Sequence, residues 1–234
     1  MNYQEDYRER YRKIKCNWED SLTKYRAIVE GYTDEKTKIL DVGCGHGDFM
    51  APVYSRAGEV FGIDADERAL TRNKIIINKV VGRVESLPFP DNFFDLSVSA
   101  WVLEHLENPA RAFKEIYRTL KPKGKVIFLT PNTRNYNVWL IRLIPEKWHD
   151  FFTRKIYDRQ EHDTFPKFYR MNSVKEIHEV LTPPGFKKVK LILNGDPTYI
   201  SFNEILFKLA CFVEDILEKY NLDKVHIIGI YEKY

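Results

Sequence analysis

The chain has 234 residues, of which 44% are hydrophobic and 30% charged, and its formal net charge is +3. This length supports one sizeable α/β core, and so mild a positive charge indicates no nucleic-acid partner. No apolar run approaches the ~18–20 residues that span a bilayer, and the polar first residues indicate neither a signal peptide nor an anchor, so we expect a cytoplasmic protein. The three cysteines, Cys16, Cys44 and Cys211, lie far apart, which indicates neither a disulfide framework nor a metal site.

Apolar side chains recur every three or four positions in residues 3–31, which predicts one or two amphipathic helices laid on a core. We treat residues 1–36 as an N-terminal helical cap. Two interpretations of its tyrosines stay open at this point. Tyr3, Tyr7 and Tyr11 either pack on the core or close over a bound cofactor.

The most informative stretch follows the cap. An apolar run from residue 39 to 42 predicts a buried strand, and three glycines at alternate positions then let the backbone turn sharply and approach a ligand closely. These are Gly43, Gly45 and Gly47. The third glycine comes one residue earlier than in the dinucleotide pattern G-x-G-x-x-G, and no phosphate-binding Gly-Lys-Ser/Thr follows, so the loop suits a nucleoside without phosphates. A second predicted strand, 59–64, ends in Asp64, at the separation where such folds place a carboxylate on ribose hydroxyls.

Strand-like and helix-like stretches alternate from residue 37 to 130, which predicts a parallel sheet with helices on both faces. The fourth strand is expected over 94–99, and a turn at Lys123-Gly124 is expected to lead into the fifth strand over 125–130. An aromatic-rich insertion over 133–170 would then shape a substrate lid at the carboxyl ends of the strands. Beyond it we expect a helix that begins near the N-cap candidate Asn172-Ser173 and runs over 173–181, a strand over 186–193, a helix over 203–220 and a last strand over 224–231.

Several motifs in this order resemble those of the class I S-adenosylmethionine-dependent methyltransferases. They are Ile39–Asp48, Gly62-Ile63-Asp64, Glu85–Asp95, Val102–Leu106 and Leu120–Gly124. The resemblance implies an α/β fold with a Rossmann-like, seven-stranded, mostly parallel sheet, helices on both faces, the N-terminal helical cap and the helical insertion after strand 5. It also implies that strands six and seven form a short hairpin pair. We expect a single domain over 1–234, with the cofactor-binding core in 37–132 and the C-terminal part of the core in 171–234.

The resemblance also implies S-adenosylmethionine as the cofactor. The glycine loop, with Cys44, would then pass under the amino-acid part of the cofactor, while Asp41 either anchors the loop or reaches the amino group. Asp64, followed by Ala65, would meet the ribose hydroxyls. An alternative for the loop is a plain strand-to-helix turn, in which the glycines serve only close packing.

Two further positions concern the adenine and methionine ends. Relatives often carry an acid after Gly82, whereas this chain has Arg83, so the Val84 backbone and Glu85 become the expected adenine contacts. Arg83 itself either stacks on the base or is a solvated arginine. Ala100 and Trp101 are expected beside the methionine portion, and Trp101 either faces the sulfonium through a cation–π contact or packs in the core.

Candidate residues for the acceptor side are fewer. An oxygen acceptor must lose a proton as it attacks, and histidine is the usual base near neutral pH, so His105, His149 and His162 are the candidates. A structural hydrogen bond is the alternative for His105, and an ordinary surface position is the alternative for the other two. Substrate contacts are expected from three residues around the insertion. They are Trp148, Tyr169 and Arg170, and Arg170 could instead form an ion pair that pins the insertion.

The sequence therefore predicts a methyltransferase that acts on a small-molecule or a lipid- or glycan-linked acceptor, with oxygen preferred over nitrogen or carbon. The alternatives are an NAD(P)-dependent oxidoreductase and a non-catalytic cofactor-binding scaffold or peripheral membrane adaptor. Residues 134–159 combine basic and aromatic side chains, which leaves peripheral membrane contact open. The helix expected over 203–220 has a wide apolar face, which suits core packing, a dimer or a lipid surface.

Overall fold

The computed structural model describes residues 3–136 and 166–234. These residues fall into two compact units, each built from three segments of the chain. We call them the sheet unit and the helical unit. The sheet unit comprises Leu22–Pro131, Lys167–Ile192 and Ile227–Tyr234, and the helical unit comprises Met1–Ser21, Asn132–Pro166 and Leu193–His226.

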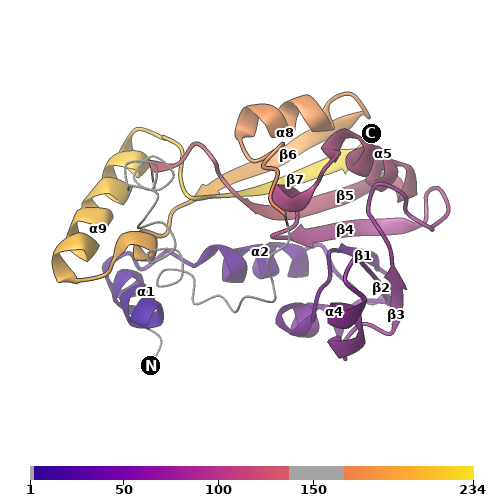
Figure 1. Cartoon of the computed structure of the whole chain (residues 1–234), viewed down its shortest axis with the longest axis horizontal. Helices are drawn as coiled ribbons and strands as arrows, with labels where there is room; N and C mark the ends of the chain where they lie inside the picture. Colours follow the sequence, from indigo (N-terminus) through magenta and orange to yellow (C-terminus); the bar gives the residue numbers. More distant parts are fainter. Residues whose placement is uncertain (1–2, 137–165) are drawn as a thin grey trace. The chain divides into compact units, whose positions relative to one another are not determined.

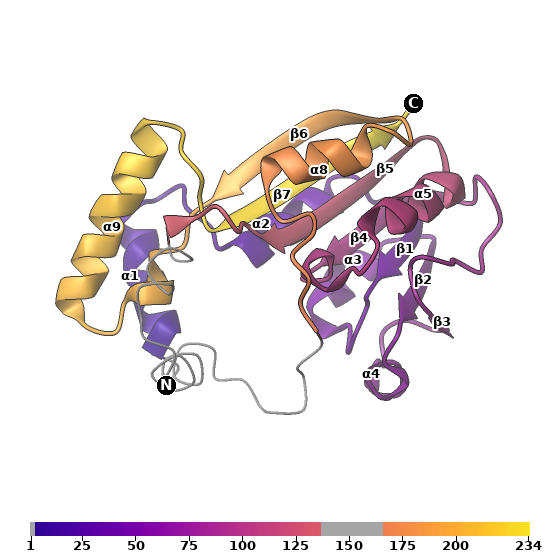
Figure 2. The same cartoon turned by 45° about the horizontal axis from the view of Figure 1, so that its top comes forward.

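Seven strands among the described residues form one sheet, in the order β3-β2-β1-β4-β5-β7-β6 (Figure 1). The strands are β1 (Lys38–Val42), β2 (Glu59–Asp64), β3 (Asn78–Val81), β4 (Phe94–Ala100), β5 (Leu120–Pro131), β6 (Phe186–Asn194) and β7 (His226–Lys233). Neighbouring strands from β3 to β5 are parallel, whereas β7 runs in the opposite direction (Figure 2). The expected Rossmann-like, mostly parallel sheet is confirmed.

The strand order reverses at β1. This strand pairs with β2 on one side, where Leu40 lies opposite Phe61, and with β4 on the other side, where Leu40 lies opposite Ser97. In open α/β sheets, ligands bind beyond the carboxyl ends of the strands at such a reversal. The segments that follow β1 and β4 are therefore the place to look for a site.

Helices flank this sheet and complete the helical unit. The described α-helices are α1 (Tyr3–Ile14), α2 (Ser21–Glu30), α3 (Ala51–Tyr54), α4 (Glu67–Arg72), α5 (Pro109–Thr119), α8 (Val174–Leu181) and α9 (Glu204–Lys219). Short 3-10 turns are η1 (Asp48–Met50), η2 (Leu103–His105) and η4 (Pro197–Ile200). The helix predicted to begin near Ser173 does so, because the Ser173 side chain accepts a hydrogen bond from the Glu176 amide and caps α8.

Both faces of the sheet are covered, because successive side chains of a strand point to opposite faces. On β5, Ile127 and Leu129 belong to a buried cluster that contains Tyr25 of α2. Phe128, between them, instead lies edge-on to Phe113 of α5, with ring centroids 6.1 Å apart. Figures 1 and 2 show α5 and α8 on one face and α2 on the other, which confirms the expected layers.

Two details of the sheet differ from the sequence-based expectation. The fifth strand starts at Leu120 rather than at Lys125, because the predicted turn at Lys123-Gly124 is an irregularity within the strand, with Lys123 at a φ of 65°. The last two strands are neighbours, but they are not joined by a short hairpin. Their connection carries η4 and α9.

The helical unit brings together α1 and α9, which lie side by side in both views (Figures 1 and 2). The Tyr7 ring of α1 lies against Phe207 of α9, with ring centroids 4.7 Å apart and the ring planes tilted by 35°, and Tyr11 lies edge-on to Trp18 at 5.0 Å. Tyr7 and Tyr11 are buried in this aromatic cluster. For these two tyrosines, the packing interpretation therefore describes the structure.

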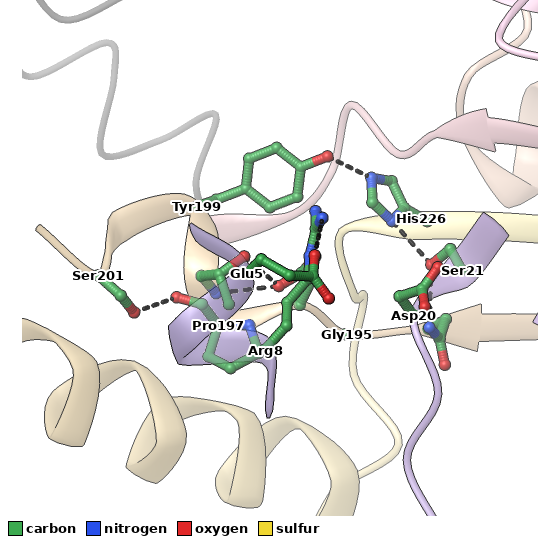
Figure 3. Close-up of polar contacts among 12 residues, drawn as sticks. Glu5, Arg8, Asp20, Ser21, Gly195, Pro197, Tyr199, Ser201 and His226 are labelled. Carbon is green, nitrogen blue, oxygen red and sulfur yellow. Dashed lines mark hydrogen bonds and ion pairs between the residues drawn. The ribbon is translucent and has the colours of Figure 1, made fainter. Parts of the chain in front are cut away.

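A buried polar network forms the interior of the helical unit (Figure 3). One ring nitrogen of His226, Nδ1, lies 2.8 Å from the Ser21 hydroxyl, and the other, Nε2, lies 3.0 Å from the Tyr199 hydroxyl. Burial lowers the pKa of His226 to about 3, so this ring is neutral at physiological pH. Beside it, the Arg8 guanidinium donates to the buried Asp196 carboxylate at 3.2 and 3.3 Å.

Candidate active site

The glycine loop is tied to the end of the neighbouring strand. The amide nitrogens of Gly43 and Cys44 both donate to the carbonyl oxygen of Ile63, at 2.8 and 3.3 Å. The next amide, that of Gly45, donates to the Asp64 carboxylate at 2.8 Å. The chain leaving β1 is thus fixed to the carboxyl end of β2, at the reversal in strand order.

Asp64 has a central position in this arrangement. Its Oδ2 accepts the Gly45 amide, and its Oδ1 accepts the Asp66 amide at 2.9 Å. Asp66 in turn caps α4 through the Arg68 amide. A carboxylate has about four lone-pair sites, so two backbone bonds leave acceptor capacity for two hydroxyl groups of a ligand. This capacity fits a ribose diol.

Gly43 and Gly45 differ in what surrounds them. A methyl group on Gly43 would lie 2.2 Å from Cγ2 of Val102, whereas a methyl group on Gly45 would meet nothing within 4 Å. Both residues have a positive φ, 71° and 45°, which disfavours any larger residue. Gly43 therefore serves close packing, and Gly45 borders open space, which is the geometry expected beneath a bound cofactor.

Cys44 and Gly47 are placed by packing. The Cys44 thiol is directed towards Gly62, where a methyl group would lie 2.7 Å from Sγ, and burial raises the pKa of this thiol. Gly47 lies against Asn73, whose side-chain amide donates to the Gly45 carbonyl at 3.1 Å. Asn73 therefore braces the loop, a role that the sequence did not reveal.

Asp41 is buried at the end of β1. The Tyr54 hydroxyl of α3 donates to its Oδ2 at 2.6 Å. Burial raises the pKa of Asp41 to about 7, and the nearby Asp64 charge adds to the shift, while the Tyr54 hydrogen bond opposes it. The expected anchoring role is consistent with this contact, which links β1 to the helix after the loop.

The third strand and its continuation contain the predicted adenine end. The Gly82 amide donates to the Asp64 carbonyl at 2.9 Å, which brings residues 82–85 beside the loop. Val84 is buried, and the Glu85 carbonyl accepts from Arg111 at 2.9 Å. Arg83 forms exposed ion pairs with two acids, Glu85 at 3.4 Å and Glu107 at 3.3 Å. Arg83 is thus exposed, and its stacking on a bound base stays a prediction. Ala65 is exposed beside Asp64.

Trp101 follows β4 in an unusual backbone conformation. Its φ is 60°, and its amide donates to the Leu129 carbonyl at 2.9 Å. A bulky residue at positive φ is strained, and such strain concentrates at functional sites. Ala100 and Trp101 are partly buried and pack against the hydrophobic core. Trp101 therefore contributes to core packing, and it also lies directly after the central strand β4.

The turn η2 connects the end of β4 to the segment after the insertion. The Glu104 carbonyl accepts the amides of Phe168 and Tyr169 at 2.8 and 3.1 Å. Tyr169 has a φ of 50°, and Arg170 donates to the Glu107 carbonyl while its guanidinium lies 5.3 Å from the Phe168 ring. Tyr169 and Arg170 are therefore brought next to the turn that carries His105.

A buried polar network supports η2 from below. The Glu104 side chain is 4% exposed, and the Thr130 hydroxyl lies 3.4 Å from its Oε2. Asn172 donates to the same hydroxyl at 2.6 Å. Burial raises the pKa of Glu104, although the His105 charge opposes the shift. The sequence pointed to the histidine of this motif, but no pattern distinguished the glutamate as the buried residue.

The remaining predictions fall partly outside the described residues. His149, His162 and Trp148 lie in 137–165, which the model does not describe. Within 3–136 and 166–234, no group of three histidine, cysteine or acidic side chains is arranged to hold a metal ion. The same ranges contain no helix that is long and apolar enough to cross a membrane.

Comparison with known proteins agrees with this geometry. Residues 40–128 match the family model of the methyltransferase domain. An uncharacterized protein of Methanocaldococcus jannaschii is 30% identical over 81% of this chain and 83% of its own length. A ubiquinone biosynthesis O-methyltransferase of Pseudomonas putida is 28% identical over 80% of this chain and 82% of its own length. A demethylmenaquinone methyltransferase of Anoxybacillus flavithermus is 36% identical, but the chain spans only 50% of it.

A solved structure shows the same fold. The S-adenosylmethionine dependent methyltransferase from Mesorhizobium loti superposes with a TM-score of 0.61 at 18% identity, covering 90% of this chain and 96% of the other. Three observations support the same family: the order of the strands in the sheet, the glycine loop bonded to Asp64, and the match of the methyltransferase domain model. The chain belongs to the class I S-adenosylmethionine-dependent methyltransferases.

Proposed function

We propose that the chain transfers the methyl group of S-adenosylmethionine to an oxygen atom of a small-molecule or a lipid- or glycan-linked acceptor. The observation that carries the donor half of the proposal is the junction of Gly45 with Asp64, where one carboxylate fixes the loop and keeps acceptor capacity for a ribose diol. The bound cofactor supplies an electrophilic methyl group on a sulfonium. The protein must hold the acceptor in line with it and exclude water.

The cofactor-binding roles follow from position. Asp64 would accept the two ribose hydroxyls, with Ala65 beside it, and the loop would pass under the amino-acid part at Gly45, where the space is open. Val84 would present its backbone to the adenine edge. Trp101, whose strained backbone places it directly after β4, would lie near the sulfonium and favour its charge by about 1 kcal/mol.

An oxygen acceptor requires a base, and His105 is the candidate within the described residues. It lies in η2, next to the segment with Tyr169 and Arg170, which we propose as acceptor contacts. His149 and His162 remain proposed alternatives. The Pseudomonas putida relative is named an O-methyltransferase of ubiquinone biosynthesis and matches over most of its length, so a hydroxylated aromatic ring with a lipid tail is the first acceptor to try.

Two measurements test the proposal in order. Calorimetry with S-adenosylhomocysteine and with NAD⁺ comes first, and we expect binding of the former alone; binding of NAD⁺ instead would favour the oxidoreductase alternative. Transfer of labelled methyl from S-adenosylmethionine to a dihydroxylated prenyl-aromatic ring comes second, with the fully O-methylated ring as the matched control. Cofactor binding without transfer to any hydroxylated acceptor would favour the non-catalytic scaffold.

The base is tested with a matched pair of histidine variants. His105→Gln should lower kcat/KM by roughly 10²–10⁴-fold and flatten its pH dependence, while the affinity for S-adenosylhomocysteine changes little. His178→Gln is the control, because His178 is exposed on α8 and contacts only its own helix through Thr182 in the bonds described. Equal activity of the two variants would remove His105 from the proposal.

A further inference from the structure

Helix α9 of the helical unit carries a row of exposed apolar side chains, which we call the α9 stripe. It consists of Ile205, Leu209, Phe212 and Ile216, whose exposed fractions are 79%, 52%, 61% and 37%. Spacings of four, three and four residues keep these side chains on one face of a helix. Soluble monomers rarely expose large contiguous apolar patches, so the α9 stripe indicates an interaction surface.

The buried face of the same helix is already occupied. Phe207, Ala210 and Glu214 are at most 2% exposed. Phe207 packs against Tyr7 of α1, and the Tyr136 hydroxyl lies 3.3 Å from Glu214. Packing within the helical unit therefore accounts for one face of α9 and leaves the stripe on another.

Charged residues border the stripe on one side only. Lys208 and Asp215 lie one residue before Leu209 and Ile216 respectively, so both fall along the same edge. The other edge is made of Leu206 and Val213, which are partly buried and apolar. Glu204 and Lys219, both exposed, fall along the same edge as Lys208 and Asp215, so the charged edge has two cations and two anions. Lys208 and Asp215, seven residues apart, lie beside the middle of the stripe and determine which partner fits.

We propose that the α9 stripe binds the same stripe of a second copy of this chain, with the two helices antiparallel about a twofold axis. Antiparallel packing that places Leu209 opposite Phe212 of the second copy also places Ile205 opposite Ile216. In that register, Lys208 lies within two residues, or about 3 Å along the helix axis, of the level of Asp215 in the second copy. Symmetry repeats this pair, so the stripe is complementary to itself in shape and in charge.

A parallel pair lacks this complementarity. In parallel two-helix packing, an edge residue faces the one five positions further along the partner helix. Lys208 would then face Val213, and Asp215 would face Tyr220, so neither charge would have an opposite partner. The charge pattern therefore selects the antiparallel arrangement.

The available area suits a reversible dimer. Tyr220 and Leu222, 63% and 48% exposed, extend the stripe beyond the helix. With about 180 Å² for each fully exposed side chain, near the lower end of the range for aromatic residues, and the exposed fractions as weights, the six residues offer on the order of 600 Å² per copy. A symmetric pair would bury about 1,200 Å², the lower end of the range for specific interfaces.

A lipid surface fits the charges less well. Anionic headgroups attract helices with basic borders, whereas α9 carries Glu204, Asp215 and Glu218 on its exposed surface. These acids form ion pairs with α1, from Arg10 to Glu204 at 2.7 Å and from Lys15 to Asp215 and Glu218 at 2.8 and 3.0 Å. Along the charged edge of the stripe, Glu204 and Asp215 match Lys208 and Lys219 in number, so no excess of positive charge borders the stripe. The Asp215 side chain stays 55% exposed beside Lys15, so it is accessible to Lys208 of a second copy.

Charge reversal gives a decisive test by sedimentation velocity over a concentration series. Lys208→Asp and Asp215→Lys should each raise the dimer dissociation constant at least tenfold, because each places like charges together twice. A mixture of the two variants should form a heterodimer with an affinity near that of the original chain, because opposite charges meet again. Homodimers that persist in both single variants, or a mixture that stays monomeric, would overturn the antiparallel arrangement.

The apolar contribution is tested separately. Leu209→Glu and Phe212→Glu should abolish dimerisation while circular dichroism stays unchanged, because both side chains are exposed. Ile77→Glu is the matched control, since Ile77 is 89% exposed and lies in the sheet unit. The proposal would be refuted if the original chain stayed monomeric at about 200 µM, a concentration at which even weakly associating chains form dimers. Loss of vesicle binding, instead of loss of dimer, in Phe212→Glu would also refute it.

Discussion

Alanine substitutions at Gly43 and Gly45 should affect stability and cofactor binding to different extents. Both glycines have a positive φ, which costs an alanine about 1–2 kcal/mol. At Gly43 the new methyl group would also lie 2.2 Å from the Val102 side chain, whose branched Cβ leaves it few rotamers. Overpacking of this kind costs about 1–3 kcal/mol more, so Gly43→Ala should lose roughly 2–5 kcal/mol and Gly45→Ala only about 1–2 kcal/mol.

Gly45→Ala should lower the affinity for the cofactor more than Gly43→Ala does, which is the reverse of the order expected for stability. The methyl group of Gly45→Ala points into the open space where we propose that the cofactor passes. We expect its affinity for S-adenosylhomocysteine to fall by about 10–100-fold, a loss of roughly 1.4–2.8 kcal/mol. Urea denaturation measures the stability of each variant, and calorimetry at a temperature where both are folded measures affinity.

A second substitution separates the clash from the backbone conformation. The double variant Gly43→Ala with Val102→Ala removes the Val102 methyl groups and should recover about 1–3 kcal/mol of the stability lost in Gly43→Ala. Gly45→Ala has no such neighbour to relieve. The reasoning is refuted if Gly45→Ala binds the ligand as the original chain does, or if the two single variants lose equal stability.

Three further predictions concern buried groups. The pKa of Asp41 is raised to about 7, so ionisation of its carboxyl group lowers the free energy of unfolding progressively between about pH 4 and pH 7. Asp41→Asn should therefore be more stable than the original chain at pH 8, by up to about 4 kcal/mol, and equally stable at pH 4. A stability difference that does not vary with pH would contradict this. Gly195→Ala would place a methyl group 1.8 Å from the buried Glu214 carboxylate and should lose about 1–3 kcal/mol in urea denaturation, whereas an unchanged midpoint would mean that Glu214 moves freely. Asn172→Ala removes the buried hydrogen bond to Thr130 and should lower the free energy of unfolding by about 1–3 kcal/mol, measured by thermal unfolding. Thr130→Val removes the other partner of this bond, so stability losses that simply add in the double variant would argue against a shared bond.

Much of the fold could be predicted because local patterns agreed with the tertiary structure. The second strand was placed at residues 59–64, and β2 has these bounds, because an apolar run that ends in an acid leaves little choice of boundary. The cap of α8 at Ser173 was found from a side chain that satisfies free backbone amides. In contrast, the start of β5 was misplaced, because Lys123-Gly124 also suits a turn, and only pairing with β4 keeps the strand extended through it.

The candidate site was predictable in part for the same reason. The glycines and Asp64 were found because their backbone conformations and the strand end restrict the residue type. Asn73 and Glu104 were missed, because their roles depend on which carbonyl or hydroxyl the fold brings within reach, and no periodicity records that. The grouping of residues 1–21 with 193–226 likewise depends on long-range packing.

The pairing of α1 with α9 has a consequence for synthesis of the chain. Tyr7 is made some two hundred residues before Phe207, the ring that buries it. A helix of this length has little stability of its own in water, so α1 must wait, its aromatic face without its final cover, until α9 has been made. Throughout that interval, α1 presents exposed apolar surface to the chaperones that attend a nascent chain.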